Sequence, residues 1–145
     1  MPTSTTRFPH RLLQTAAFLL LAFGGLALAK GWQVSGLSDQ AVSLDQARAE
    51  LEAGTALLID LREPDEHARG VASGALLLPM SQLEARLDEI PTDPTARVLL
   101  ICNTQNRSRA TLRRLHERGY VHLRYVHGGM SGWARRDWPM VAAER

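Results

Sequence analysis

Short apolar runs alternate with polar, helix-like segments along most of the chain. Four runs, at 56–61, 76–78, 97–101 and 123–126, are a few residues long and are bounded mainly by turn-forming or polar residues. Runs of this length without apolar–polar alternation are typical of strands that are buried on both faces of a sheet. We therefore predict four strands here, and a further short edge strand near 33–34.

Helical patterns lie between these strands. Ser43 and Ser81 each begin a capping-box pattern, in which a glutamine or glutamate follows the serine at the third position. The predicted helices span residues 43–54, 81–90, 108–119 and 130–135. The segment between the first two strands, at 62–75, is expected to be a long polar connection. Strands that alternate with helices predict an α/β fold with a parallel sheet covered on both sides.

The first 29 residues have the three-part design of a secretory signal peptide: a basic start, an apolar centre and a small-x-small pattern that ends at Ala29. An apolar helix that remains as a membrane anchor is the alternative. The eighteen residues at 12–29 carry no charge, and a spanning helix needs about 17–25 residues. Either interpretation places the domain outside the cytoplasm, in the periplasm or anchored to the membrane and facing the periplasm.

Length and charge limit the remaining possibilities. The chain has 145 residues, which is enough for one domain of ordinary size. We expect a linker at 30–41 and the folded domain at 42–141. Without Arg7 and Arg11 of the N-terminal segment, fifteen Lys and Arg face fifteen Asp and Glu. Nucleic-acid-binding domains usually show a basic excess, so we expect no nucleic-acid partner, and membrane contact only through 12–29 if that segment is uncleaved.

The chain contains one cysteine, Cys102, which stands between the run at 97–101 and the helix predicted from Ser108. A single cysteine forms no internal disulfide, and the histidines lack the spacing of metal ligands, so no metal site is expected. The first amides of a helix are unpaired and the helix dipole is positive there, so a thiolate or a bound anion is stabilised. Arg107 adds a permanent charge and a planar set of donors that fits oxyanions.

Residues 102–108, CNTQNRS, resemble the active-site loop of the rhodanese family, whose usual form is C-x-x-G-x-R-S. The segment at 57–79 resembles the family's D-x-R-x-P-x-E-[FY]-x-x-G-H-I-P-G-A motif, and the segment at 126–140 is similar to its carboxyl-terminal G-G motif with a following tryptophan. The three matches occur in the family's order and span most of 42–140. The resemblance implies a doubly wound parallel sheet of about five strands flanked by helices.

The resemblance also implies sulfurtransferase chemistry without a metal or an organic cofactor. Cys102 would attack the outer sulfur of a small anion such as thiosulfate, or of a persulfide donor, and form a persulfide. The sulfur would then pass to a thiol, to cyanide or to a protein acceptor. Asp60 and Arg62 would support the site structurally. The residues expected to bind the substrate are Asn103, Thr104, Gln105, Asn106, Arg107 and Ser108.

Gln105 stands where the family usually has glycine. If that position requires a positive φ, a side chain costs about 1–2 kcal/mol, although Asn103 and Asn106 tolerate left-handed geometry and can share the turn. Four residues separate Cys102 from Arg107, one fewer than in cysteine-dependent phosphatases, so the sequence only weakly supports phosphatase activity. A catalytically weak module that relays sulfur for a partner protein, a redox-sensing thiol and a buried structural cysteine also fit the sequence.

Overall fold

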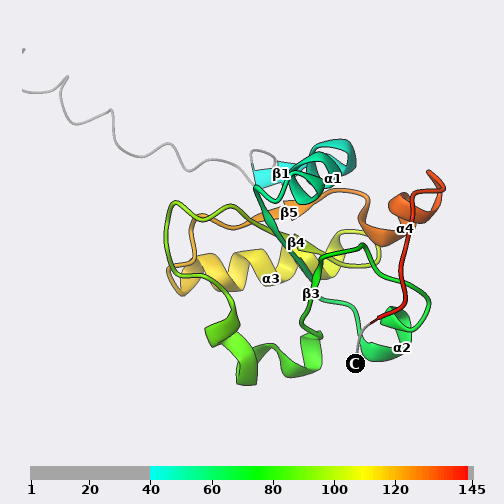
Figure 1. The fold of residues 1–145 in the computed structure, drawn as a ribbon. Helices are drawn as coiled ribbons and strands as arrows, with labels where there is room; N and C mark the ends of the chain where they lie inside the picture. Colours follow the sequence, from blue (N-terminus) through cyan, green and yellow to red (C-terminus); the bar gives the residue numbers. More distant parts are fainter. Residues whose placement is uncertain (1–39, 144–145) are drawn as a thin grey trace, which may run out of the picture. The chain divides into compact units, whose positions relative to one another are not determined.

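A five-stranded parallel sheet forms the centre of residues 40–143, the part of the chain that the computed structural model describes (Figure 1). The strands are β1 (Ala41–Val42), β2 (Leu57–Asp60), β3 (Leu76–Leu77), β4 (Val98–Ile101) and β5 (Arg124–Val126). Their order across the sheet is β1-β5-β4-β2-β3, and every neighbouring pair runs parallel. The predicted α/β fold with about five parallel strands is confirmed.

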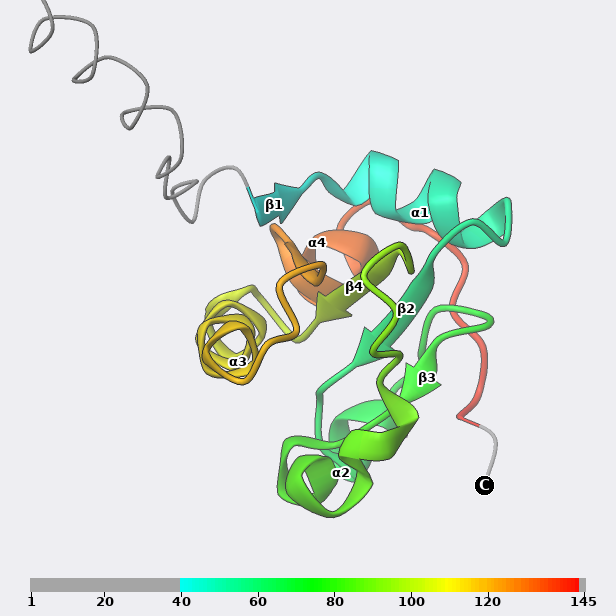
Figure 2. The same cartoon turned by 90° about the vertical axis from the view of Figure 1, so that its left-hand side faces the viewer.

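Helices cover both faces of this sheet. They are α1 (Leu44–Glu52), α2 (Pro64–His67), the 3-10 helix η2 (Met80–Glu89), α3 (Asn106–Glu117) and α4 (Gly129–Ala134). Figure 2 looks along α3 and shows α1 and α3 on opposite sides of the strands. Residues of α1 and α4 share one buried apolar cluster, and residues of α3 and η2 belong to the other. The sheet is therefore doubly wound.

Alternate residues of the central strands enter the two clusters. In β2, Leu58 packs with α1 and α4, whereas Ile59 packs with α3. In β4, Leu99 and Leu100 divide between the clusters in the same way, and all four side chains are fully buried. Burial on both faces explains why these strands have continuous apolar runs rather than an apolar–polar alternation.

The predictions for residues 1–29 and for an edge strand near 33–34 concern residues outside the described part of the chain. Within 40–143, no helix is both long enough and apolar enough to cross a membrane. Strand β1 pairs with β5 and begins at Ala41, one residue before the expected start of the domain. This strand was not predicted, because a strand of two residues leaves no apolar run in the sequence.

The helix predicted to begin at Ser81 is wrong in type. The structure has a 3-10 helix here, with non-helical torsion angles at Arg86. The reason is the partner of Ser81, whose amide and hydroxyl both donate to the carboxylate of Glu63, at 3.1 and 2.7 Å. Ser81 therefore binds a residue from another segment, and it lies inside a helix whose N-cap position is Pro79, so it does not cap this helix.

Two further elements differ from the sequence prediction. The connection expected between β2 and β3 contains the short helix α2, with Pro64 in its first turn, where proline is well tolerated. Helix α3 begins at Asn106, two residues before the predicted start at Ser108. This earlier start places the amide of Ser108 in the first turn of α3, next to the cysteine.

Candidate active site

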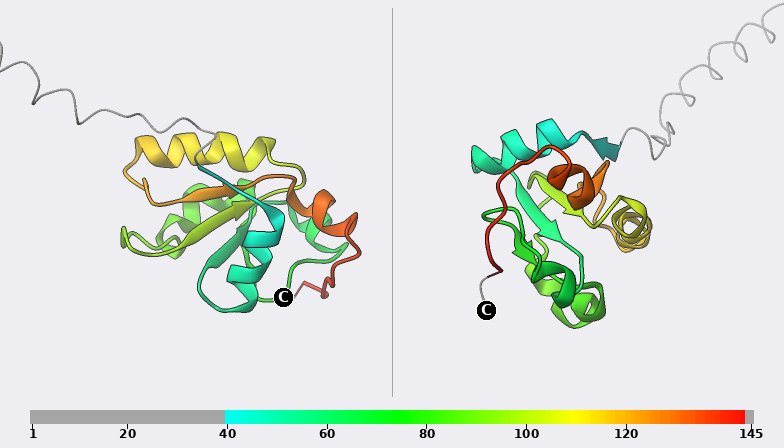
Figure 3. Two further views of the ribbon diagram at one scale, coloured as in Figure 1. Left: turned by 90° about the horizontal axis from the view of Figure 1, so that it is seen from above. Right: turned by 90° about the vertical axis from the view of Figure 1, so that its right-hand side faces the viewer.

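Cys102 directly follows β4 at the carboxyl end of the sheet. Strand β4 pairs with β2 so that Ile101 lies opposite Asp60, and the two central strands therefore end side by side. Figure 3 shows that the start of α3 and the whole of α4 lie at this same end. In open α/β sheets, ligands bind beyond the carboxyl ends of the strands, so the cysteine occupies the expected position for a functional group.

The sulfur atom of Cys102 caps the first turn of α3. The amide of Ser108, the third residue of the helix, donates to Sγ at 3.4 Å, and the thiol donates to the Ser108 hydroxyl oxygen at 3.6 Å. Gln105 precedes the helix but makes no side-chain cap. The sulfur therefore takes the place that a serine or aspartate oxygen usually has at a helix start. The amide of Ser108, which has no partner within the helix, and the positive end of the helix dipole favour negative charge on this sulfur.

Helix α4 holds the backbone of residues 102–108, which we call the cysteine loop. The amide of Met130 donates to the carbonyl oxygen of Cys102 at 2.8 Å, and the amide of Ser131 donates to that of Asn103 at 2.8 Å. The hydroxyl of Ser131 also donates to Oδ1 of Asn103 at 2.8 Å. The loop carbonyls are therefore turned toward α4, and the Asn103 side chain is bound to protein.

Gly129 lies against the same loop. It has a φ of 58°, and a β-carbon at this position would lie 2.5 Å from three carbonyl oxygens, those of residues 102–104. We expect Gly129→Ala to displace the loop, to lower the free energy of unfolding by about 2–3 kcal/mol and to slow alkylation of the thiol. Denaturant unfolding and the rate of reaction with iodoacetamide measure the two effects.

Gly54→Ala is the matched control for this prediction. Gly54 has a similar φ of 66°, but a β-carbon there would meet nothing within 4 Å. This variant therefore isolates the backbone strain, about 1–2 kcal/mol, from the contact with the loop. Equal losses of stability in the two variants, with unchanged thiol reactivity in both, would contradict a role of Gly129 in placing the loop.

Gln105 does not have a left-handed backbone. Its φ is −175°, and among residues 40–143 the one non-glycine residue with positive φ is Asp137. The left-handed geometry considered for Gln105, Asn103 and Asn106 is therefore wrong. The side chain of Gln105 instead accepts the amide of Gly128 through Oε1, at 3.1 Å. Gln105 thus ties the cysteine loop to the turn before α4.

The guanidinium of Arg107 is bound by a carboxylate of this chain. Its two terminal nitrogens donate to the two oxygens of Glu66, each at 2.6 Å. Glu66 also accepts the amide of Glu63 at 3.0 Å. The hydrogen bonds from Arg107 lower the pKa of Glu66 to about 2, and Glu66 in turn raises the pKa of Arg107. Both groups are charged at neutral pH, so the positive charge expected to bind a substrate anion already has a partner.

Asp60 and Arg62 form a buried ion pair at the end of β2. Nε and Nη2 of Arg62 donate to the carboxylate of Asp60, with a shortest distance of 2.6 Å, and both side chains are at most 6% exposed. Arg62 also donates to the carbonyl oxygens of Glu66 and Gly70, at 3.2 and 2.9 Å. The pair therefore holds α2, and α2 carries the carboxylate that binds Arg107. His67 lies next to it, with Nε2 3.5 Å from Oδ1 of Asp60.

The expected site residues lie around Cys102, but most of their side chains do not contact its sulfur. Among them, Ser108 alone contacts the sulfur through the hydrogen bonds described. The side chains of Asn103, Gln105 and Arg107 bind other protein groups, while Thr104 and Asn106 are exposed. The backbone amides and the exposed side chains of the loop remain for a ligand.

Sequence reasoning missed Glu66 and the start of α4. Glu66 is the glutamate of the D-x-R-x-P-x-E pattern, so the sequence contained a signal for it. The pattern did not indicate that Glu66 pairs with Arg107. Gly129 belongs to the recognised G-G motif. The amides of Met130 and Ser131 have no signal in the sequence, because any residue supplies an amide and its direction depends on the fold.

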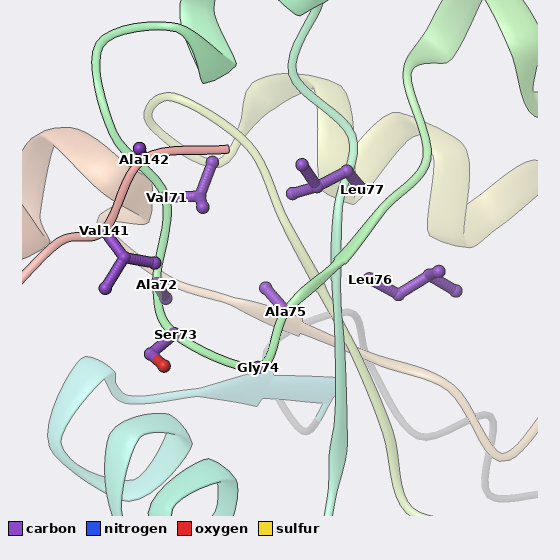
Figure 4. Close-up of a pocket in the computed structure, with 9 residues that line it drawn as sticks. All are labelled: Val71, Ala72, Ser73, Gly74, Ala75, Leu76, Leu77, Val141 and Ala142. Atoms are coloured by element: carbon purple, nitrogen blue, oxygen red, sulfur yellow. The ribbon is translucent and has the colours of Figure 1, made fainter. Parts of the chain in front are cut away.

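A groove of about 540 Å³ lies elsewhere, along residues 71–77 and against Val141 and Ala142 (Figure 4). None of the residues that line it belongs to the loop at 102–108. Within the described part of the chain, no group of three His, Cys, Asp or Glu residues is placed to hold a metal ion.

Comparisons with known proteins agree with the fold. The rhodanese-like domain family matches residues 43–136. A sulfurtransferase of Allochromatium vinosum is 38% identical over 102 residues, which cover 70% of this chain and 92% of that protein. A human single-domain sulfurtransferase of known structure is 27% identical, with a TM-score of 0.59 over 67% of this chain and 96% of that one.

A third similarity concerns the fold alone. The crystal structure of a rhodanese-related protein from Thermoplasma volcanium has a TM-score of 0.63 at 23% identity, and the match covers 72% of this chain and 99% of that one. The chain belongs to the rhodanese-like family of sulfurtransferases.

Proposed function

We propose that this protein is a sulfurtransferase that carries a sulfane sulfur as a persulfide on Cys102. One observation carries the proposal: Sγ of Cys102 lies at the start of α3 and accepts the amide of Ser108 at 3.4 Å. A helix start stabilises a thiolate and, once a sulfur has been added, the negative terminal sulfur of a persulfide. The name of the Allochromatium vinosum relative, a sulfurtransferase, is consistent with this chemistry.

The reaction has two half-reactions. The thiolate of Cys102 attacks the outer sulfur of thiosulfate, the S–S bond of the donor breaks, and sulfite leaves with the bonding electron pair. A thiol, cyanide or a thiol of a protein acceptor then attacks the terminal sulfur of the persulfide, and the Cys102 thiolate is restored. Because the two substrates react in separate steps through a covalent intermediate, we expect ping-pong kinetics.

The second candidate is a catalytically weak module that relays sulfur for a partner protein. Gln105 does not favour this second candidate, because its φ of −175° lies outside the left-handed region that requires glycine. The burial of Cys102 does favour it, since the residue is 1% exposed and reactive cysteines are usually partly exposed. The two candidates share the persulfide and differ in the rate at which a small acceptor removes it.

The test uses the full chain and intact-protein mass spectrometry. Incubation with thiosulfate should add the mass of one sulfur atom, and because the chain has one cysteine, a thiol-specific gain reports Cys102. Cyanide should then remove this mass and release thiocyanate, with parallel double-reciprocal plots in the steady state. A persulfide that persists in cyanide would support the relay. Absence of any persulfide with thiosulfate and with alkyl persulfide donors would overturn both candidates.

A further inference from the structure

The cation of the cysteine loop lies in acidic surroundings. Arg107 binds both oxygens of Glu66, and the nearby charges of Glu63 and Cys102 also raise its pKa. Glu66 is held from a second side by the amide of Glu63, at 3.0 Å. The segment at 60–69 carries four carboxylates and two arginines, and one of those arginines, Arg62, is itself paired. The segment at 60–69 therefore adds no net positive charge beside Arg107.

The balance of charge affects substrates of different charge unequally. An arginine without a carboxylate partner attracts a dianion about twice as strongly as a monoanion, because the Coulomb energy scales with the product of the charges. When a carboxylate holds both terminal nitrogens of the arginine, most of this attraction is cancelled. The remaining attraction at the loop comes from the amides at the start of α3, which are partial charges of about half an elementary charge in total.

We infer that Glu66 is a positioning residue that sets donor specificity: by holding and neutralising Arg107, it favours sulfane donors with one negative charge over the thiosulfate dianion. The inference rests on the proposed function and specifies its substrate class. Glu66 acts through Arg107 and does not touch the donor. Its pKa of about 2 means that it is charged throughout the pH range of a transfer assay, so the preference should not change between pH 6 and 9.

Thiosulfate and methanethiosulfonate form a matched pair of donors for this inference. Both present an outer sulfur bonded to a sulfonyl sulfur, but the methyl group of the second replaces one negatively charged oxygen. Attack by the Cys102 thiolate breaks the S–S bond in each, and sulfite or methanesulfinate leaves with the electron pair. Both donors form the same persulfide, so a difference between their KM values reports the charge and size of the leaving group.

The experiment compares the wild type with Glu66→Gln, which keeps the size of the side chain and removes its charge. We expect KM for thiosulfate to fall about tenfold and KM for methanethiosulfonate to fall about threefold, with kcat changed less than twofold for both donors. Glu66→Asp keeps the charge and should keep the wild-type ratio of the two KM values. A ratio that does not change in Glu66→Gln would overturn the inference while leaving the proposed function intact.

Glu50→Gln is the matched control. Glu50 makes a similar two-oxygen pair with Arg97, at 2.8 and 3.0 Å, but Arg97 stands directly before β4, at the end of the strand remote from Cys102. This variant should leave the ratio of KM values unchanged, which separates a local effect of charge from a general loss of an ion pair.

A binding measurement tests the inference without any reaction. In the Cys102→Ser background, titration calorimetry compares thiosulfate affinity with and without Glu66→Gln. Tighter binding of thiosulfate by about tenfold, together with a smaller gain for methanethiosulfonate, is expected. Equal gains in affinity for the two anions would overturn the inference, whether or not the donors react with the wild-type protein. Failure of both donors to react with the wild-type protein would instead count against the proposed function.

Discussion

Cys102→Ser is expected to lose at least about 10³-fold in sulfur transfer, because a neutral hydroxyl is a far weaker nucleophile toward sulfane sulfur than a thiolate. The variant should also gain no sulfur mass from any donor, since the chain has no second cysteine. The serine oxygen can still accept the amide of Ser108 at the start of α3, so the fold should persist. Thiocyanate production and intact mass measure the loss, and the unfolding midpoint reports the fold.

Ser108→Ala is the control for this prediction. It removes the hydroxyl that lies 3.6 Å from the sulfur but keeps the amide that donates to it. If the amide and the helix start stabilise the sulfur, this variant should lose less than about tenfold in transfer. Turnover that survives in Cys102→Ser would contradict the proposed chemistry, whatever the behaviour of Ser108→Ala.

Asp60→Asn is expected to lower the free energy of unfolding by about 3–5 kcal/mol, the usual cost of leaving one member of a buried ion pair without its partner. The asparagine keeps the shape of the side chain, but the guanidinium of Arg62 remains buried without a carboxylate. A domain of this size is stable by about 5–15 kcal/mol, so the effect is a large part of the total. Denaturant unfolding measures it.

Glu84→Gln provides the comparison with an exposed pair. The carboxylate of Glu84 accepts hydrogen bonds from Arg114 and Arg118, at 2.9 and 2.8 Å, and all three side chains are more than 40% exposed. Water screens such pairs, so the unfolding midpoint should hardly change. Similar effects of Asp60→Asn and Glu84→Gln would show that the Asp60–Arg62 pair does not hold the site.

Four of the five strands, β2 to β5, and their order in the chain could be predicted, because strands that are buried on both faces consist of continuous apolar residues. Strand β1 (Ala41–Val42) was not predicted, because a strand of two residues leaves no such run in the sequence. The apolar runs at 56–61 and 97–101 correspond to β2 and β4, whose residues are buried on both faces. The position of Cys102 between a central strand and a helix was also correct. Cys102 directly follows an apolar run in the sequence, so its place at the end of a strand could be predicted without knowing which other segments pack against it.

Two capping patterns of the same form, at Ser43 and Ser81, have different outcomes in the structure. The hydroxyl of Ser43 accepts the amide of Gln46 at 3.2 Å and begins α1, as predicted. Ser81 has a pattern of the same form but donates to Glu63, which lies eighteen residues earlier, and it lies inside a 3-10 helix that begins at Met80. The difference depends on which segment packs against each serine, and the motif itself does not contain that information.

Apolar runs, caps and short motifs are local properties of the chain, so they were enough to predict the α/β class, the family and the junction at which the cysteine stands. The partners of the loop could be found only in the folded domain: Glu66 for Arg107, Gly128 for Gln105, and the α4 amides for the loop carbonyls. These partners come from segments more than twenty residues away. Directional hydrogen bonds and ion pairs require both groups to be placed within about 3 Å, and the packing of the whole domain determines that placement.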